Sequence, residues 1–285
     1  MRIYKSLFLS LLLVGCGSSS PKSPENVETD IFVPVKKSTF DWNLGDVDKD
    51  TPFADDIQIV DVDAFTTSKE TVTALHNKGK KVIAYLSVGS WEKYRPDEAS
   101  FPDALLGKVY PGWEDERLLN IKRLDLLKPV MIARLNMIKE KGFDGIEPDN
   151  MDVYSWDSET NYTGFALTLE DGKIYADWLI EEAHKRGLSI GQKNAGELSE
   201  EYVSKFDWAL SENAFILEIE DEMKAYAKAG KAVFATEYID NSEDTGKTPY
   251  TEESFIAQVC QNANTLGYTA ILKKRDLDSF VVRCP

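Results

Sequence analysis

The sequence predicts an α/β fold in which eight parallel strands close into a (β/α)8 barrel, or TIM barrel, with a long insertion after the third strand. Amphipathic helical segments repeatedly end in glycine, and an apolar strand follows each of them at once. Eight such strands fit one barrel in a chain of 285 residues. No glycine-rich phosphate loop follows the first strand, which disfavours an open doubly wound sheet.

The strands and helix ends can be placed from this pattern. The predicted strands are, in order, residues 40–44, 57–64, 81–88, 143–149, 188–194, 206–212, 232–238 and 269–274. The helix-ending glycines are Gly79, Gly142, Gly187, Gly230 and Gly267. Glycine favours the left-handed conformation that follows many helices, so we expect positive φ at these positions.

The predicted insertion, about residues 91–125, is rich in aromatic side chains. Trp91, Tyr94, Phe101, Tyr110 and Trp113 all fall within it. Loops at the carboxyl ends of barrel strands build active sites, so these rings can stack on sugars or can form the insertion's own small core.

The N-terminus has the features of an export signal. Basic Arg2 and Lys5 precede an apolar run over residues 7–14, which is too short to span a membrane. The run ends in Leu-Val-Gly-Cys, which resembles a bacterial lipobox and implies cleavage after residue 15 and lipidation of Cys16. The alternative is an ordinary signal peptide with an incidental cysteine. We therefore expect a signal peptide over residues 1–15, a flexible tether over 16–39 and the (β/α)8 barrel domain over 40–285, in an exported, membrane-anchored lipoprotein.

Two cysteines remain if Cys16 is lipidated. In an oxidising exported compartment, Cys260 and Cys284 suggest one disulfide, and otherwise two buried thiols. Neither has a histidine nearby in the sequence, which disfavours a thiol nucleophile or a zinc site.

Composition limits the partners. Acids outnumber bases 49 to 33, so the net charge is −16. Such a chain disfavours nucleic acid and anionic membrane surfaces and attracts cationic ligands. We expect a monomer that contacts the membrane only through its lipid anchor.

Polar residues collect where the predicted strands end. Because alternate residues of a barrel strand point inward, Glu147 and Asp149 share one face of the fourth strand. The same parity places Asp61, Asp63, Tyr85, Lys193, Glu212 and Glu237 at the barrel mouth, with Asn194 just beyond Lys193. A single acid at a strand end is usually a cap or a turn former. Several that converge repel one another, which raises their pKa values and is costly for stability, and so they indicate a functional site.

Elimination leaves carboxylate chemistry. The only histidines, His76 and His184, lie in helices close to a glycine and away from the mouth, so histidine-based catalysis and histidine metal sites are disfavoured. Paired carboxylates can hydrolyse glycosidic bonds, or a cluster of Asp61, Asp63, Glu147 and Asp149 can hold Mg²⁺ or Ca²⁺. Tyrosine, tryptophan and lysine at the mouth favour sugar, with no metal and no cofactor.

Seven motifs in order resemble glycoside hydrolase family 114. They are IVDVDAF, IAYLSVGSWEKYRPD, GWEDERLLNI, GFDGIEPDNMDVY, AHKRGLSIGQKNAGE, FDWALSENAF and AVFATEY, and they cover about residues 40–240. The resemblance implies an endo-α-1,4-polygalactosaminidase activity on a (β/α)8 barrel, with an amino-sugar polysaccharide as substrate.

The resemblance also implies roles for single residues. Asp149 would be the nucleophile and Glu212 the acid/base of a retaining mechanism. Ser211 and Asn213 depart from the family's usual residues around this glutamate, so Glu237 stays as the rival acid/base. The implied substrate-binding or orienting residues are Asp63, Tyr85, Glu147, Asn150, Lys193 and Asn194. A non-catalytic carbohydrate-binding lipoprotein and a metal-dependent hydrolase remain the alternatives.

Overall fold

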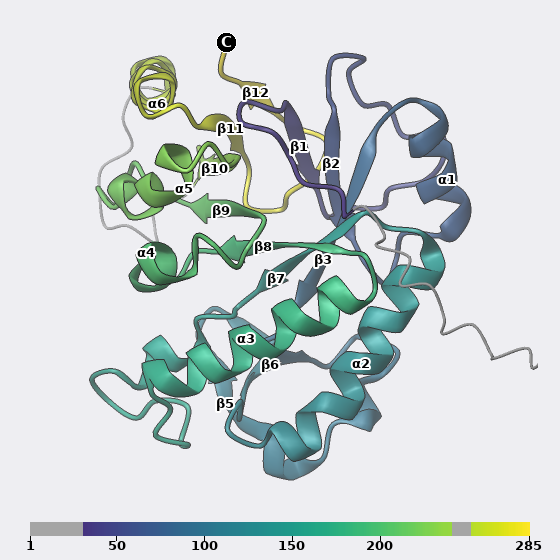
Figure 1. Cartoon of the computed structure of the whole chain (residues 1–285), viewed down its shortest axis with the longest axis vertical. Helices are drawn as coiled ribbons and strands as arrows, with labels where there is room; N and C mark the ends of the chain where they lie inside the picture. The colour runs from purple at the N-terminus through teal and green to yellow at the C-terminus, as the bar shows by residue number, and fades with distance from the viewer. Residues whose placement is uncertain (1–30, 241–251) are drawn as a thin grey trace, which may run out of the picture.

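A computed structural model describes residues 31–240 and 252–285. It confirms the predicted α/β barrel, in which eight parallel strands follow one another around a curved sheet (Figure 1). The strands are β1 (Phe40–Asn43), β2 (Ile59–Asp63), β3 (Lys81–Ser87), β7 (Gly145–Asp149), β8 (Ser189–Lys193), β9 (Trp208–Glu212), β10 (Val233–Tyr238) and β11 (Thr269–Lys273). Each lies within one predicted strand range.

Helices connect most of these strands. They are α1 (Lys69–Asn77), α2 (Leu124–Lys141), α3 (Leu169–Lys185), α4 (Ser199–Tyr202), α5 (Lys224–Lys228) and α6 (Glu252–Leu266). Short 3-10 helices are η1 (Glu98–Ser100), η2 (Asp103–Leu105), η3 (Val153–Asp157), η4 (Gly196–Leu198) and η5 (Glu220–Met223). The connection from β1 to β2, all of which is described, contains no helix, so the first of the eight expected strand–helix units is incomplete. The five predicted helix-ending glycines all have positive φ, from 67° to 92°.

The barrel has a seam between its first and last parallel strands. Strand β12 (Val282–Arg283) pairs antiparallel with β11 beside β1 (Figure 1). Within the described chain no ladder joins β1 to β11 directly. Instead Lys273 Nζ on β11 lies 3.2 Å from Asp41 Oδ1 on β1, and both side chains are buried. A side-chain ion pair therefore bridges the seam.

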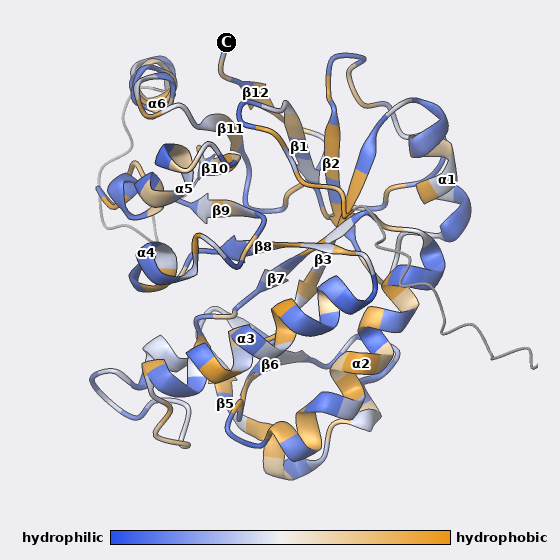
Figure 2. Cartoon of the chain, in the orientation of Figure 1, coloured by the Kyte–Doolittle hydropathy of each residue, from blue (hydrophilic) through white to orange (hydrophobic). Residues whose placement is uncertain are grey.

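Apolar side chains form two separate layers. Phe40, Trp42, Trp208 and Phe234 belong to a cluster inside the barrel. A larger cluster fills the space between the strands and the surrounding helices. Helices α1 and α3 alternate between hydrophobic and hydrophilic segments along their length, as expected of helices that bury one face (Figure 2).

The insertion folds as a sheet of its own. Strands β4 (Ser90–Glu92), β5 (Leu106–Tyr110) and β6 (Trp113–Leu119) form an antiparallel sheet in the order β4-β6-β5. Buried Arg134 of α2 donates to Asp97 and to the carbonyl of Ser87, which fixes the insertion to the end of β3.

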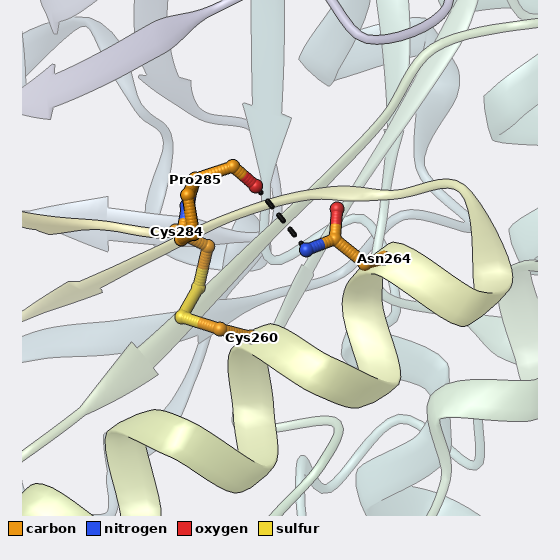
Figure 3. The surroundings of a disulfide bond; sticks show 4 residues. All are labelled: Cys260, Asn264, Cys284 and Pro285. Atoms are coloured by element: carbon orange, nitrogen blue, oxygen red, sulfur yellow. Dashed lines mark hydrogen bonds between the residues drawn. A yellow bond between two sulfur atoms is a disulfide. The ribbon is translucent and has the colours of Figure 1, made fainter.

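Both ends of the described chain are held against the domain. Cys260 of α6 and Cys284 are joined by a disulfide, and Asn264 donates to the Pro285 carbonyl 3.2 Å away (Figure 3). At the other end, Val35 forms a bridge with Lys231, so part of the predicted tether contacts the barrel. The predicted signal peptide, Cys16 and the tether up to residue 30 lie outside the described residues. No helix among the described residues is both long and apolar enough to cross a membrane.

Candidate active site

Three neighbouring strands end in charged residues at the mouth. Asp149 ends β7, Lys193 ends β8 and Glu212 ends β9. Each is followed by an asparagine with a left-handed backbone: Asn150, Asn194 and Asn213, with φ of 59°, 47° and 53°. Asparagine tolerates this conformation better than most residues, so the chain can turn sharply away after each strand.

Lys193 is the centre of the site. Its Nζ lies 2.7 Å from Glu147, 2.7 Å from Asp149 and 2.9 Å from Glu212. It also lies 4.8 Å from the centre of the Trp42 ring. Burial favours the neutral amine, but the carboxylates of Asp149, Glu147 and Glu212 outweigh it and raise the pKa of Lys193 well above its usual range. A permanent cation therefore holds three acids together.

A carboxyl pair lies beneath this cation. Asp61 and Glu147 are 1% and 0% exposed. Burial, and then the charge of Glu147, raise the pKa of Asp61 well above its usual range, and burial raises the pKa of Glu147 to about 7. Among the described residues, neither Asp61 Oδ1 nor Glu147 Oε2 receives a hydrogen bond from another donor. A proton held by Asp61 and donated to Glu147 satisfies both oxygens.

Asp149 is held on both oxygens. Lys193 donates to Oδ1 at 2.7 Å, while the Tyr85 hydroxyl donates to Oδ2 at 2.9 Å and the Asn150 amide at 3.0 Å. Burial and the Asp149 charge raise the pKa of Tyr85 well above its usual range, so its hydroxyl stays a donor. These contacts place Tyr85 and Asn150 beside Asp149, while their predicted role with the substrate stays a prediction.

Glu212 has a comparable set of donors. Tyr238 donates to Oε1 at 2.5 Å, and the Asn194 amide donates to Oε2 at 3.3 Å. The Asn194 side chain also accepts the backbone N–H of Glu212 at 2.9 Å. The sequence reasoning missed Tyr238, because it assigned the opposite face of β10 to the mouth.

The predicted position of Glu237 at the mouth is wrong. Phe234 and Tyr238 point into the barrel, whereas Ala235 belongs to the outer apolar layer. Glu237 shares the outer face, where it accepts the backbone N–H groups of Phe215 and Ile216 at 3.0 and 3.2 Å. It thus holds the loop after β9, and burial raises its pKa to about 7.

Asp63 ties the mouth to the insertion. Its carboxylate lies 2.6 Å from Arg95 and accepts the backbone N–H groups of Phe65 and Thr66. Arg95 also lies 2.7 Å from Glu92 on β4. Asp63 is 5% exposed, so these contacts make it an anchor for the loops and turn it away from the Lys193 cluster.

The two histidines lie at the opposite end of the barrel. His76 pairs with Asp144 just before β7, at 2.7 Å, and His184 pairs with Asp207 just before β9, at 2.9 Å. Both aspartates also accept a backbone N–H of the neighbouring strand. Their position agrees with the sequence, which placed the histidines away from the mouth.

Aromatic and acidic surfaces flank the cluster. The Tyr110 hydroxyl on β5 donates to Asn150 Oδ1 at 3.0 Å, and Tyr94 and Trp113 of the insertion are 62% and 46% exposed. On the other side of Glu212, a pocket of about 310 Å³ is lined by further acids, Asp152, Glu197 and Glu222. Burial, and then the charge of Asp149, raise the pKa of Asp152 to about 7.

The acids do not form a metal site. Lys193 occupies the space between Glu147, Asp149 and Glu212, while Asp63 faces Arg95. In residues 31–240 and 252–285 no group of three or more histidine, cysteine, aspartate or glutamate side chains has the arrangement of a metal site.

Solved structures share this fold. Ega3 of Aspergillus fumigatus, crystallised in complex with galactosamine, superposes with a TM-score of 0.80 at 30% identity, over 91% of this chain and 100% of that one. The glycoside hydrolase domain of PelA from Pseudomonas aeruginosa superposes with a TM-score of 0.66 at 15% identity, over 86% and 98% of the two chains. The second likeness shows the fold alone.

Sequence comparison gives the family. An uncharacterized protein of Methanocaldococcus jannaschii is 24% identical over 231 residues, which make up 73% of this chain and 65% of that protein's length. The profile of glycoside-hydrolase family GH114 matches residues 21–285, nearly the whole chain. With a carboxylate cluster at the mouth of a barrel like that of Ega3, the chain belongs to glycoside hydrolase family GH114.

Proposed function

We propose that this glycoside hydrolase cleaves α-1,4-linked galactosamine polymers within the chain, with retention of configuration. Asp149 is the nucleophile and Glu212 is the acid/base. The observation that carries the proposal is the pair of acids held by one ammonium group. Asp149 and Glu212 have side chains 17% and 24% exposed, whereas Glu147 beside them is 0% exposed. Only the first two can reach a substrate.

The spacing of these two acids supports retention. Lys193 Nζ lies 2.7 Å from Asp149 Oδ1 and 2.9 Å from Glu212 Oε2, so the sum, 5.6 Å, is an upper limit for the separation of the two oxygens. Retaining glycosidases hold their carboxyl groups about 5–5.5 Å apart, and inverting ones roughly 6.5–9.5 Å. This spacing supports direct attack by Asp149 on the sugar over attack by a water molecule held between them.

The mechanism follows from these positions. Asp149 attacks the anomeric carbon as Glu212 gives its proton to the leaving glycosidic oxygen, which forms a glycosyl ester and releases one chain end. Glu212 then takes a proton from water, whose oxygen attacks the same carbon and returns Asp149 to its carboxylate. Lys193, Tyr85 and Asn150 keep the Asp149 carboxylate oriented throughout.

Charge and relatives support the choice of substrate. Galactosamine carries an ammonium group where its amine is free, and the pocket beyond Glu212 adds three carboxylates to the acidic mouth. Ega3, 30% identical to this chain, was crystallised with galactosamine. The exposed rings of Tyr94 and Trp113 offer flat apolar surfaces to sugar rings on the other side.

The test uses the soluble domain with polygalactosamine and with its N-acetylated form. We expect oligosaccharides from the first, with the α-anomer appearing first in NMR spectra. Asp149→Asn and Glu212→Gln should each lower kcat roughly a thousandfold, whereas Asp115→Asn, at an exposed position on β6, serves as the matched control. Full activity in Asp149→Asn overturns the proposal. Tight binding without turnover supports the carbohydrate-binding alternative, and loss on chelation supports the metal-dependent one.

We also propose that the enzyme is anchored to a membrane by a lipid on Cys16. The support is the sequence of the first 16 residues, with two basic residues, an apolar run and Leu-Val-Gly-Cys. Cys16→Ser should move the protein from the membrane fraction to the soluble fraction and abolish incorporation of labelled palmitate. An unchanged distribution would show that the cysteine is incidental.

A further inference from the structure

The insertion buries two glutamates that the mechanism does not use. Glu92 on β4 and Glu116 on β6 are direct cross-strand partners, and they are 0% and 6% exposed. The Tyr94 hydroxyl donates to Glu92 at 2.9 Å and lies 3.4 Å from Glu116. Glu92 also has Arg95 at 2.7 Å, but no cation lies within 4 Å of Glu116 among the described residues. Glu116 is therefore the less compensated of the two.

A chain of hydrogen bonds leads from Glu116 to Asp149. Glu116 Oε2 accepts the Ser90 hydroxyl at 2.6 Å, and the Ser90 and Ser87 hydroxyls lie 2.7 Å apart. The Asn150 amide nitrogen donates to Ser87 Oγ at 3.0 Å, and also to Asp149 Oδ2 at 3.0 Å. Three side chains and four hydrogen bonds thus connect a carboxylate of the insertion to the proposed nucleophile.

The direction of donation along these hydrogen bonds is fixed by Glu116, the acceptor at one end. A serine hydroxyl has one hydrogen, and an ionised carboxylate only accepts. With Glu116 ionised, Ser90 donates to Glu116, Ser87 donates to Ser90, and Ser87 Oγ is left to accept from Asn150. The amide of Asn150 must then turn its NH₂ group toward Ser87 and Asp149, as the structure has it. Its carbonyl oxygen accepts from Tyr110 on the other side.

We propose that Glu116 is a positioning residue, which holds the Asn150 amide as a donor to Asp149 through Ser90 and Ser87. Without an acceptor at Glu116, the Ser90 and Ser87 hydroxyls can reverse their direction of donation. The Ser87 hydroxyl then points its hydrogen at the Asn150 NH₂ group. The amide then rotates and turns its oxygen toward the Asp149 carboxylate, which repels it. The inference rests on the proposed role of Asp149.

Two further observations support this connection. A Cβ atom on Gly89, between Ser87 and Ser90, would lie 1.8 Å from the carbonyl oxygen of Asn150, so the two backbones are in close contact. Burial raises the pKa of Glu116 to about 7, with the charges of Glu92 and Asp149 adding to the rise, while hydrogen bonds from Ser90 and Tyr94 oppose it. The hydrogen bonds between Glu116 and Asn150 can therefore reverse their direction of donation as the pH passes through about 7.

The kinetic test removes one member of the chain at a time. Glu116→Met, of similar length but without an acceptor, and Ser90→Ala should each lower kcat roughly tenfold while KM changes little, because the substrate does not touch either residue. The double variant should be no slower than the slower single variant, since both break one chain. Glu116→Gln keeps an acceptor oxygen and should restore most of the activity. Glu114→Gln, exposed on the same strand, is the matched control.

A second readout does not depend on turnover. The side-chain NH₂ signals of Asn150 in NMR spectra, assigned by their loss in Asn150→Asp, should shift with pH in the wild type and lose that shift in Glu116→Gln. Identical titration in the two proteins, or additive losses of kcat that follow losses of thermal stability, would overturn the proposal. If the wild type hydrolyses no galactosamine polymer but the amide shift is lost in Glu116→Gln, the proposed substrate fails and the chain of hydrogen bonds stands.

Discussion

Lys193→Met tests whether one buried cation holds the site together. The substitution keeps the length of the side chain but removes an ammonium group that lies 2.7, 2.7 and 2.9 Å from three carboxylates. Removing one partner from a buried ion pair costs about 3–5 kcal/mol, because the other charge is left without compensation. The carboxyl groups can reduce that cost by taking up protons, at about 1.4 kcal/mol for each unit by which a pKa rises.

The cost must therefore depend on pH. In the variant, the pKa of buried Glu147, which is already about 7, rises further above its unfolded value because the Lys193 charge that lowers it is gone. Below the unfolded value both states are protonated and the substitution costs little. As pH rises through the folded value the buried charge appears, and stability falls. We expect a loss of about 3–5 kcal/mol in the free energy of unfolding near pH 8, and a clearly smaller loss near pH 5.

Urea denaturation at the two pH values measures this difference. Lys205→Met is the control, because Lys205 pairs with Asp177 at the surface with 39% of its side chain exposed, and such pairs contribute about 0–1 kcal/mol. The variant should also lose activity near neutral pH, since Asp149 loses the ammonium group that orients its carboxylate. Equal losses at both pH values, or a loss no larger than that of Lys205→Met, would refute the reasoning.

Three further changes test separate parts of the molecule. Tyr238→Phe removes the donor to Glu212 and should lower kcat roughly tenfold at constant stability, measured by steady-state kinetics; an unchanged pH profile and kcat would exclude a role for this hydrogen bond. Burial raises the pKa of Glu237 in the folded protein to about 7, so this group should lower the wild-type free energy of unfolding by roughly 3 kcal/mol as pH rises from about 4.5 to about 7. Glu237→Gln should flatten this dependence of stability on pH, measured by urea denaturation, and an unchanged dependence would contradict the assignment. Cys284→Ser opens the disulfide to Cys260, which closes a loop over a separation of 24 residues, and should cost about 3 kcal/mol; a thermal midpoint equal to that of the wild type would contradict this.

Much of the barrel was predictable because its signals are local. Each glycine after a helix and each apolar run after it depends on a few neighbouring residues, so all eight strands were found. The predicted faces of β7 and β8 were also correct, because Glu147, Asp149 and Lys193 meet at the mouth. Together these two strands located the site.

The prediction of which face of β10 points into the barrel was wrong for a physical reason. All six of its residues are buried, so no alternation of exposed and buried positions sets which face points inward. Glu237 and Tyr238 were then equally plausible, and a carboxylate was the natural choice for a glycosidase. Glu237 is instead satisfied by two backbone N–H groups of the loop after β9, a contact that depends on the path of that loop.

The contacts of the insertion were harder to predict from the sequence. It was predicted as an aromatic loop, but it forms a sheet in which β5 and β6 pair with register shifts. The pairing of β4 with β6 places Glu116 opposite Glu92, and Glu116 accepts from Ser90 of the same strand β4. Antiparallel pairing of this kind is set by packing across the sheet, which no single segment reveals.

The protons of the cluster have an order that suits the proposed chemistry. Burial raises the pKa of Asp61 well above its usual range, and Glu147 takes up a proton near neutral pH, since burial raises its pKa to about 7. When both are neutral, Asp149 and Glu212 are the remaining partners of Lys193. A protonated Glu212, the form that a general acid needs, then leaves the ammonium charge to Asp149 alone. The buried acids beneath the mouth thus determine how much of the Lys193 charge is left for Asp149, the proposed nucleophile. Glu147→Gln stays neutral, so its kcat should hold as the pH rises above about 7, where the wild-type kcat should fall as Glu147 ionises.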